Sequence, residues 1–126
     1  MSVDQIIHAA FPDASVQVDI TDDFIRSNQN FFEIDNALDP LAYLPAYMLW
    51  CVKNKDDYDQ LVTDCTIDAI AYFGRTVNQP IATLDLKKRC STFQRQTILA
   101  FLYWCQESLE IVDEQQIERA IKQWKK

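Results

Sequence analysis

A single glycine, Gly74, occurs among the 126 residues of this chain. Tight β-hairpins usually need several residues that can adopt a positive φ, so a sheet-rich fold is disfavoured. One glycine also excludes the glycine-rich loops of dinucleotide-binding and P-loop proteins, because each motif contains at least two. The sequence therefore predicts an all-α fold of about five helices, with at most one short strand or hairpin.

The composition is typical of one folded domain. Hydrophobic residues make up 48% of the chain and charged residues 25%, and no linker, repeat or low-complexity tract interrupts it. A chain of this length can bury a sizeable core without metal or disulfide support. We therefore predict a single domain over residues 1–126, built as a compact helical bundle.

Hydrophobic residues recur at helical spacing in five segments, and local signals mark several of their ends. Pro45 is expected to break or restart one helix, and Gly74 to end another as the residue after its last turn. The segment 93–109 is apolar nearly all round, which predicts an enclosed central helix. The five segments are 3–11, 40–52, 57–73, 93–109 and 114–124, and capping patterns occur at Ser2 with Gln5, Ser91 with Gln94 and Asp113 with Gln116.

The segment 12–36 carries weaker signals. Alternation of Val16, Val18 and Ile20 permits a short strand, whereas residues 22–32 permit a helix, and both interpretations stay open. The residues 81–84 permit a short extended piece, and the basic cluster 87–89 is expected to be a solvated loop.

Metal and cofactor motifs are not recognisable. The four cysteines are far apart in the sequence, no Cys-x-x-Cys pair occurs, and His8 is the single histidine. We expect Cys51, Cys65 and Cys105, within apolar helical patterns, to be buried thiols, and we predict no metal and no cofactor. The N-terminus lacks a secretory signal, and no apolar run could cross a bilayer, so a cytoplasmic location without membrane contact is expected.

Charge is distributed unevenly along the chain. Residues 1–74 contain 13 acidic and three basic side chains, whereas residues 75–126 contain six acidic and nine basic ones, and the whole chain has a net charge of −7. Such a field repels nucleic-acid phosphates and attracts basic proteins. We therefore expect a basic protein partner and no nucleic acid.

One helical face in the segment 57–73 is the candidate partner-binding site. The carboxylates Asp57, Asp64 and Asp68 align at helical spacing, and Ile67 and Ile70 lie beside them, outside the expected buried arc. Another part of the chain covers these isoleucines in one interpretation. In the other, they form the apolar centre of a docking surface with an acidic rim.

Catalysis finds less support in the sequence. Asp64 and Asp68 have the spacing of a magnesium-binding or acid–base pair, but no second acidic motif accompanies them. His8 could be oriented by Asp4, yet no nucleophile occurs near it in the sequence. We therefore predict a protein that is not an enzyme, with no catalytic residues.

Three short blocks resemble a family of small uncharacterised bacterial proteins. That family has a Leu-Pro-Ala-Tyr block, present here within residues 43–49, an early Ile-x-x-Ala-Phe element, present here at 7–11, and a later Gln-x-x-x-Ile-x-x-Phe-Leu segment, present here at 94–102. The resemblance implies a small bacterial protein, similar to immunity proteins, and it provides no catalytic residues.

Together these features predict a cytoplasmic protein-binding module. Its most concrete form is an immunity protein that binds and neutralises a basic toxin domain. The alternatives are a small metal-dependent helical enzyme that uses Asp64 and Asp68, and a structural homodimer formed through Ile67 and Ile70.

Overall fold

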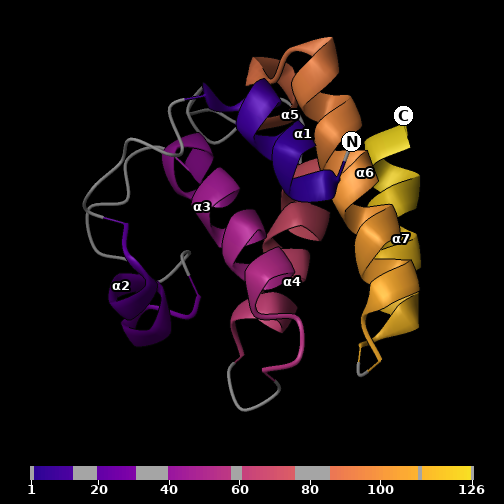
Figure 1. Cartoon of the computed structure of the whole chain (residues 1–126). Coiled ribbons are helices and arrows are strands. Elements are labelled where there is room, and N and C mark those ends of the chain that lie inside the picture. The colour runs from indigo at the N-terminus through magenta and orange to yellow at the C-terminus, as the bar shows by residue number, and fades with distance from the viewer. Residues whose placement is uncertain are drawn as a thin grey trace.

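The computed structural model describes residues 2–12, 20–30, 40–57, 61–75, 86–110 and 112–125. These residues form seven helices and contain no strand, which confirms the all-α prediction. The helices are α1 (Val3–Ala10), α2 (Asp22–Ser27), α3 (Pro40–Lys53), α4 (Val62–Arg75), α5 (Leu86–Arg89), α6 (Thr92–Ser108) and α7 (Glu114–Lys125) (Figure 1).

The helix α4 has neighbours on two sides, because it packs against α3 and most extensively against α7. The helix α6 packs against α1 and α7, and α2 lies against α3 at the edge of the bundle (Figure 1). One buried cluster receives side chains from every helix of the described ranges. Its largest fully buried members include Ile7, Leu44, Tyr47, Met48, Phe73, Leu86, Phe101, Leu102 and Ile117.

The predicted helix starts are confirmed where local capping chemistry determines them. The side chain of Gln5 accepts a hydrogen bond from Ser2 N at 3.0 Å at the start of α1. Ser91 and Gln94 form the reciprocal pair that precedes α6, with distances of 3.0 and 3.1 Å. These contacts satisfy N–H groups that have no partner inside the helix.

The helix α7 also begins as predicted. Asp113 Oδ1 accepts a hydrogen bond from Gln116 N at 3.2 Å. Its apolar residues recur at helical spacing and form one inward stripe, and all four of them are buried. They are Ile117, Ala120, Ile121 and Trp124.

The prediction that Pro45 breaks its helix is wrong. The helix α3 continues through Pro45, which is buried and is the sixth residue of the helix. Proline removes a single backbone hydrogen bond there, to the carbonyl one turn earlier. Burial of the neighbouring Leu44, Tyr47 and Met48 offsets that cost, because it holds the helix against the core.

Gly74 does not end a helix, contrary to the prediction. It lies inside α4, which begins at Val62 rather than at residue 57 and continues to Arg75. A Cβ atom on Gly74 would lie 2.6 Å from Trp124 Nε1, so the absence of a side chain permits the close approach of α7. The glycine therefore serves helix packing and not chain reversal.

Two further predictions need correction. The basic cluster 87–89 is part of the short helix α5 and not a loop, and Lys87 is buried, donating to the Gln123 carbonyl at 2.5 Å. The helix α6 is not fully enclosed, because Phe93 and Tyr103 are exposed on its outer side. The expected strand residues Val16 and Val18, and the extended piece 81–84, lie outside the described residues.

Candidate functional site

Ile67 and Ile70 do not form an exposed apolar centre, so that part of the predicted partner-binding site is wrong. Both side chains have 0% of their surface exposed, and the interpretation that the chain itself covers them is confirmed. The reason lies in the position of α4, since its two neighbours α3 and α7 widen its buried face. Leu61 and Tyr72, two large apolar residues of the same segment, are exposed instead.

Asp57 lies apart from the other two predicted carboxylates. It follows the turn after α3 and accepts a hydrogen bond from Arg26 Nη1 at 3.0 Å. The same guanidinium donates to Asp22 at 2.8 Å and lies 5.3 Å from the ring centroid of Trp50. Asp57 thus belongs to a network that joins α2 to α3.

Asp64 and Asp68 are exposed on α4, one turn apart, and Asp113 joins them from the start of α7. Partial burial, and then the negative charges of Asp68 and Asp113, raise the pKa of Asp64 above its ordinary value. Among the described residues, none of the three carboxylates has a salt bridge. We call Asp64, Asp68 and Asp113 the acidic cluster.

The acidic cluster exists because α4 and α7 are parallel. Asp68, midway along α4, is hydrogen-bonded to Gln116 in the first turn of α7, and Gly74 near the end of α4 lies against Trp124 near the end of α7 (Figure 1). Both N-termini therefore lie at the same end of the molecule, where the helix dipoles are positive. Carboxylates are favourable at such ends, and Asp113 additionally caps α7.

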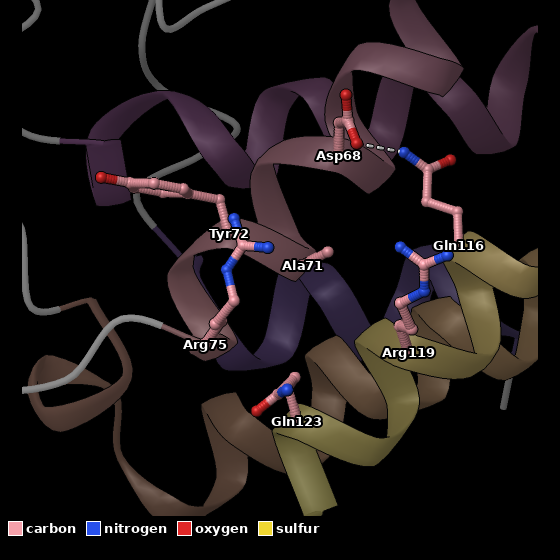
Figure 2. A pocket seen from close by; sticks show the side chains of 7 residues that line it. All are labelled: Asp68, Ala71, Tyr72, Arg75, Gln116, Arg119 and Gln123. Atoms are coloured by element: carbon pink, nitrogen blue, oxygen red, sulfur yellow. Dashed lines mark hydrogen bonds between the residues drawn. The ribbon is translucent and has the colours of Figure 1, made fainter.

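A groove lies next to the acidic cluster, between α4 and α7. Figure 2 shows Arg75 and Arg119 on either side of Ala71, with Gln123 on a third side and the hydrogen-bonded pair Asp68 and Gln116 on the fourth. Its volume is about 100 Å³. We call this feature the α4–α7 groove. The side chains that line it are Asp68, Ala71, Tyr72, Arg75, Gln116, Arg119 and Gln123.

The distribution of charge along α4 and α7 follows from their parallel packing. Acidic side chains occupy the first turns, whereas Arg75, Lys122 and Lys125 lie in the last turns. The buried Lys87 extends this basic end, because its ammonium bonds a carbonyl of the last turn of α7. The α4–α7 groove therefore lies between a negative and a positive end.

The other titratable groups offer little for chemistry at a site. All four cysteines are present as thiols, and Cys51, Cys90 and Cys105 are buried. Desolvation raises the pKa of Cys51 to about 12 and that of Cys90 to about 11. In the described ranges, no group of three or more carboxylate, histidine or cysteine side chains is arranged to hold a metal ion.

Comparisons of this chain with protein-family models, with curated proteins and with solved structures gave no match. None of the described helices is both long and apolar enough to span a membrane.

Sequence reasoning identified Asp64 and Asp68 but missed Asp113, Arg75 and Arg119. Asp113 was recognisable as a helix cap, yet its closeness to Asp64 depends on how two helices from distant parts of the sequence pack. Nothing in the sequence pointed to the two arginines, because only the packing of α4 against α7 brings them to the same groove. The site is therefore a product of the α4–α7 contact.

Proposed function

We propose that this chain is a protein-binding module that presents the acidic cluster to a basic protein partner. An immunity protein that neutralises a basic toxin domain in the cytoplasm is the most concrete form of this function. The observation that carries the proposal is the convergence of Asp64, Asp68 and Asp113, which have no salt bridge within the described residues.

Convergence matters because negative charges held close together produce a stronger local field than the same charges spread over a surface. Such a field accelerates the approach of a basic partner by roughly 10- to 1,000-fold, and the effect weakens as salt is added. Partial burial raises the pKa of Asp64, and repulsion from the carboxylates of Asp68 and Asp113 raises it further. A cationic side chain of a partner placed among them would relieve that repulsion.

The cysteines agree with a reducing compartment. Four thiols without a disulfide are typical of proteins from the cytoplasm, where thiols stay reduced. This observation supports the cytoplasmic part of the proposal. It does not bear on the identity of the partner.

The test begins with tagged proteins expressed from the genes that flank this one. Each is screened for binding to the chain by surface plasmon resonance at low and high salt. We expect one partner with a basic domain, and an association rate constant that falls steeply as salt rises. If every flanking product fails to bind, or the one that binds is acidic, the proposal is wrong.

A triple variant, Asp64→Asn, Asp68→Asn and Asp113→Asn, then locates the interface. Asparagine preserves the cap of α7, because asparagine and aspartate are equally good at that position. We expect the association rate constant to fall at least about tenfold. The matched control is Asp23→Asn, Glu107→Gln and Glu118→Gln, which removes the same charge from exposed sites elsewhere and should change the rate about twofold or less. Equal effects of the two variants would show that the acidic cluster has no special role.

A further inference from the structure

The guanidinium groups of Arg75 and Arg119 line the α4–α7 groove from opposite helices. Neither has a salt bridge with any residue that the structure describes. Two exposed guanidinium groups that border the same small groove concentrate positive charge there, and a negatively charged group between them is favourable. Their arrangement therefore calls for a negatively charged group from outside the chain.

The carboxylate that lines the groove, Asp68, is already engaged. Asp68 Oδ1 accepts a hydrogen bond from Gln116 Nε2, which fixes it at the end of the groove (Figure 2). Arg75 is oriented by a different contact, since its guanidinium lies 5.8 Å from the ring centroid of Tyr72. A guanidinium stacked on an aromatic ring keeps its N–H groups available at the edge, where they can meet an oxyanion.

We propose that the α4–α7 groove binds an oxyanion, a carboxylate or a phosphate group, between Arg75 and Arg119. The amide of Gln123 provides a third donor, on the side of the groove opposite the pair Asp68 and Gln116 (Figure 2). Guanidinium groups bind carboxylates and phosphates through paired, charge-assisted hydrogen bonds, which are stronger than neutral ones. The two arginines thus supply the affinity.

The dimensions and the charges of the groove restrict the ligand. A volume of about 100 Å³ is well below the roughly 300–1,000 Å³ of pockets that hold drug-sized ligands. One oxyanion group with a few attached atoms fits that space. Asp68 repels a second negative charge at its end of the groove, so a neutral or positively charged part of the ligand faces it.

This inference does not depend on the proposed function. The proposed function uses the negative charge of the acidic cluster, whereas oxyanion binding uses two cations on the neighbouring part of the same helix pair. Asp68 is the one residue that the two proposals share, and its replacement has opposite predicted effects on them. Asp68→Asn weakens the attraction of a basic partner and strengthens oxyanion binding.

The test is a titration of the ¹⁵N-labelled chain, followed through the arginine Nε–Hε signals at constant ionic strength. The probes are sodium acetate, sodium phosphate, and acetyl-trialanine with a free C-terminal carboxylate, each added separately. Acetyl-trialanine amide, which lacks the carboxylate, is the matched negative probe. We expect the Arg75 and Arg119 signals to move together along one saturating curve, and the Arg95 signal to stay in place.

Variants identify the groups that bind. Arg75→Gln and Arg119→Gln should each weaken binding about tenfold, and both should fold normally because the two side chains are exposed. Asp68→Asn should tighten binding about threefold. Arg95→Gln, outside the groove, is the control and should leave the affinity unchanged.

The probes also distinguish the source of the anion. Saturation by phosphate alone supports the site and assigns it to phosphate ligands, whereas saturation by acetate and the peptide acid supports it and assigns it to carboxylates. Linear shifts of all arginine signals, or binding that persists in both glutamine variants, would overturn the proposal. Binding of the peptide amide as strongly as the peptide acid would also overturn it.

Discussion

Gly74 and Trp124 lie so close together that the glycine position has no room for a side chain. The ideal position of a Cβ atom on Gly74 is 2.6 Å from Trp124 Nε1 and 2.7 Å from Trp124 Cδ1. The same indole N–H donates to the Ile70 carbonyl at 2.7 Å, so Trp124 cannot move away without losing that bond. The parallel packing of α4 and α7, and with it the acidic cluster and the α4–α7 groove, depends on this contact.

Gly74→Ala should therefore destabilise the protein, although alanine is the better helix former by about 1 kcal/mol. We expect a loss of about 1–3 kcal/mol in the free energy of unfolding, since overpacking at a tight contact costs that much. Urea denaturation followed by circular dichroism measures it. In Trp124→Phe, which removes Nε1 and the hydrogen bond that holds the ring in place, the smaller ring can shift, so the added cost of Gly74→Ala should shrink. Equal costs in both backgrounds would contradict the packing explanation.

Asp64 should make the protein less stable as the pH rises. Its pKa is raised in the folded state, so the folded state holds the proton more tightly than the unfolded chain does. Stability is lost as the pH increases from the ordinary aspartate value of 3.8 through the raised value. The change in melting temperature that Asp64→Asn causes, measured against the wild type at the same pH, should thus be more positive at pH 7 than at pH 3. If the melting-temperature difference between the variant and the wild type does not change with pH, the raised pKa of Asp64 is contradicted.

Asp22 should behave in the opposite way. The hydrogen bond from Arg26, followed by that from Trp50, lowers the pKa of Asp22 below its ordinary value. The carboxylate therefore contributes stability above pH 3.8, and this contribution is lost as the pH falls through the lowered value. Asp22→Asn should lower the melting temperature at pH 7 and have little effect in strong acid. Because Asp22 is exposed, the change should be small.

The buried thiols should react slowly with alkylating reagents. Thiolates are the reactive form, and burial raises the pKa of Cys51, Cys90 and Cys105. Iodoacetamide at pH 7.5, followed by mass spectrometry of the peptides, should modify Cys65 faster than these three, since it is only half-buried. In urea the four rates should converge. Rapid modification of Cys51 in the folded protein would show that α3 opens readily.

Metal titration tests the alternative of a metal-dependent enzyme. Asp68 accepts a hydrogen bond from Gln116 and Asp113 caps α7, and no three carboxylate, histidine or cysteine side chains of the described residues are arranged to hold a metal ion. We expect calorimetric titration with Mg²⁺, Mn²⁺ and Ca²⁺ to show no saturable heat. A saturable signal that disappears in Asp68→Asn would revive the metal hypothesis.

The fold class and the helix starts were predictable because they depend on local chemistry. A serine followed by glutamine three residues later satisfies the same N–H groups in any fold, and the scarcity of glycine disfavours hairpins everywhere in the chain. Ser91 with Gln94 therefore gave the correct start of α6 without knowledge of the bundle.

The buried face of α4 was predicted incorrectly because periodicity cannot tell how many neighbours a helix has. Ile67 and Ile70 lie outside the narrow stripe that one neighbour would cover, and they are buried by a second one. Gly74 was misassigned for a related reason, since a glycine near a helix end has the same sequence signal whether it ends the helix or admits a neighbour. Arg75 and Arg119 became a pair only through this tertiary contact.

The pairing of α4 with α7 also affects when the molecule can become complete. The ribosome makes residues 62–75 well before residues 114–125. The helix α4 therefore emerges before α7, whose Trp124 packs against it and donates to its Ile70 carbonyl. Until α7 has been synthesised, part of the apolar surface of α4 has no partner within the chain. Final assembly of this region must therefore follow synthesis of α7, and during that interval the nascent protein is most open to aggregation and to capture by chaperones.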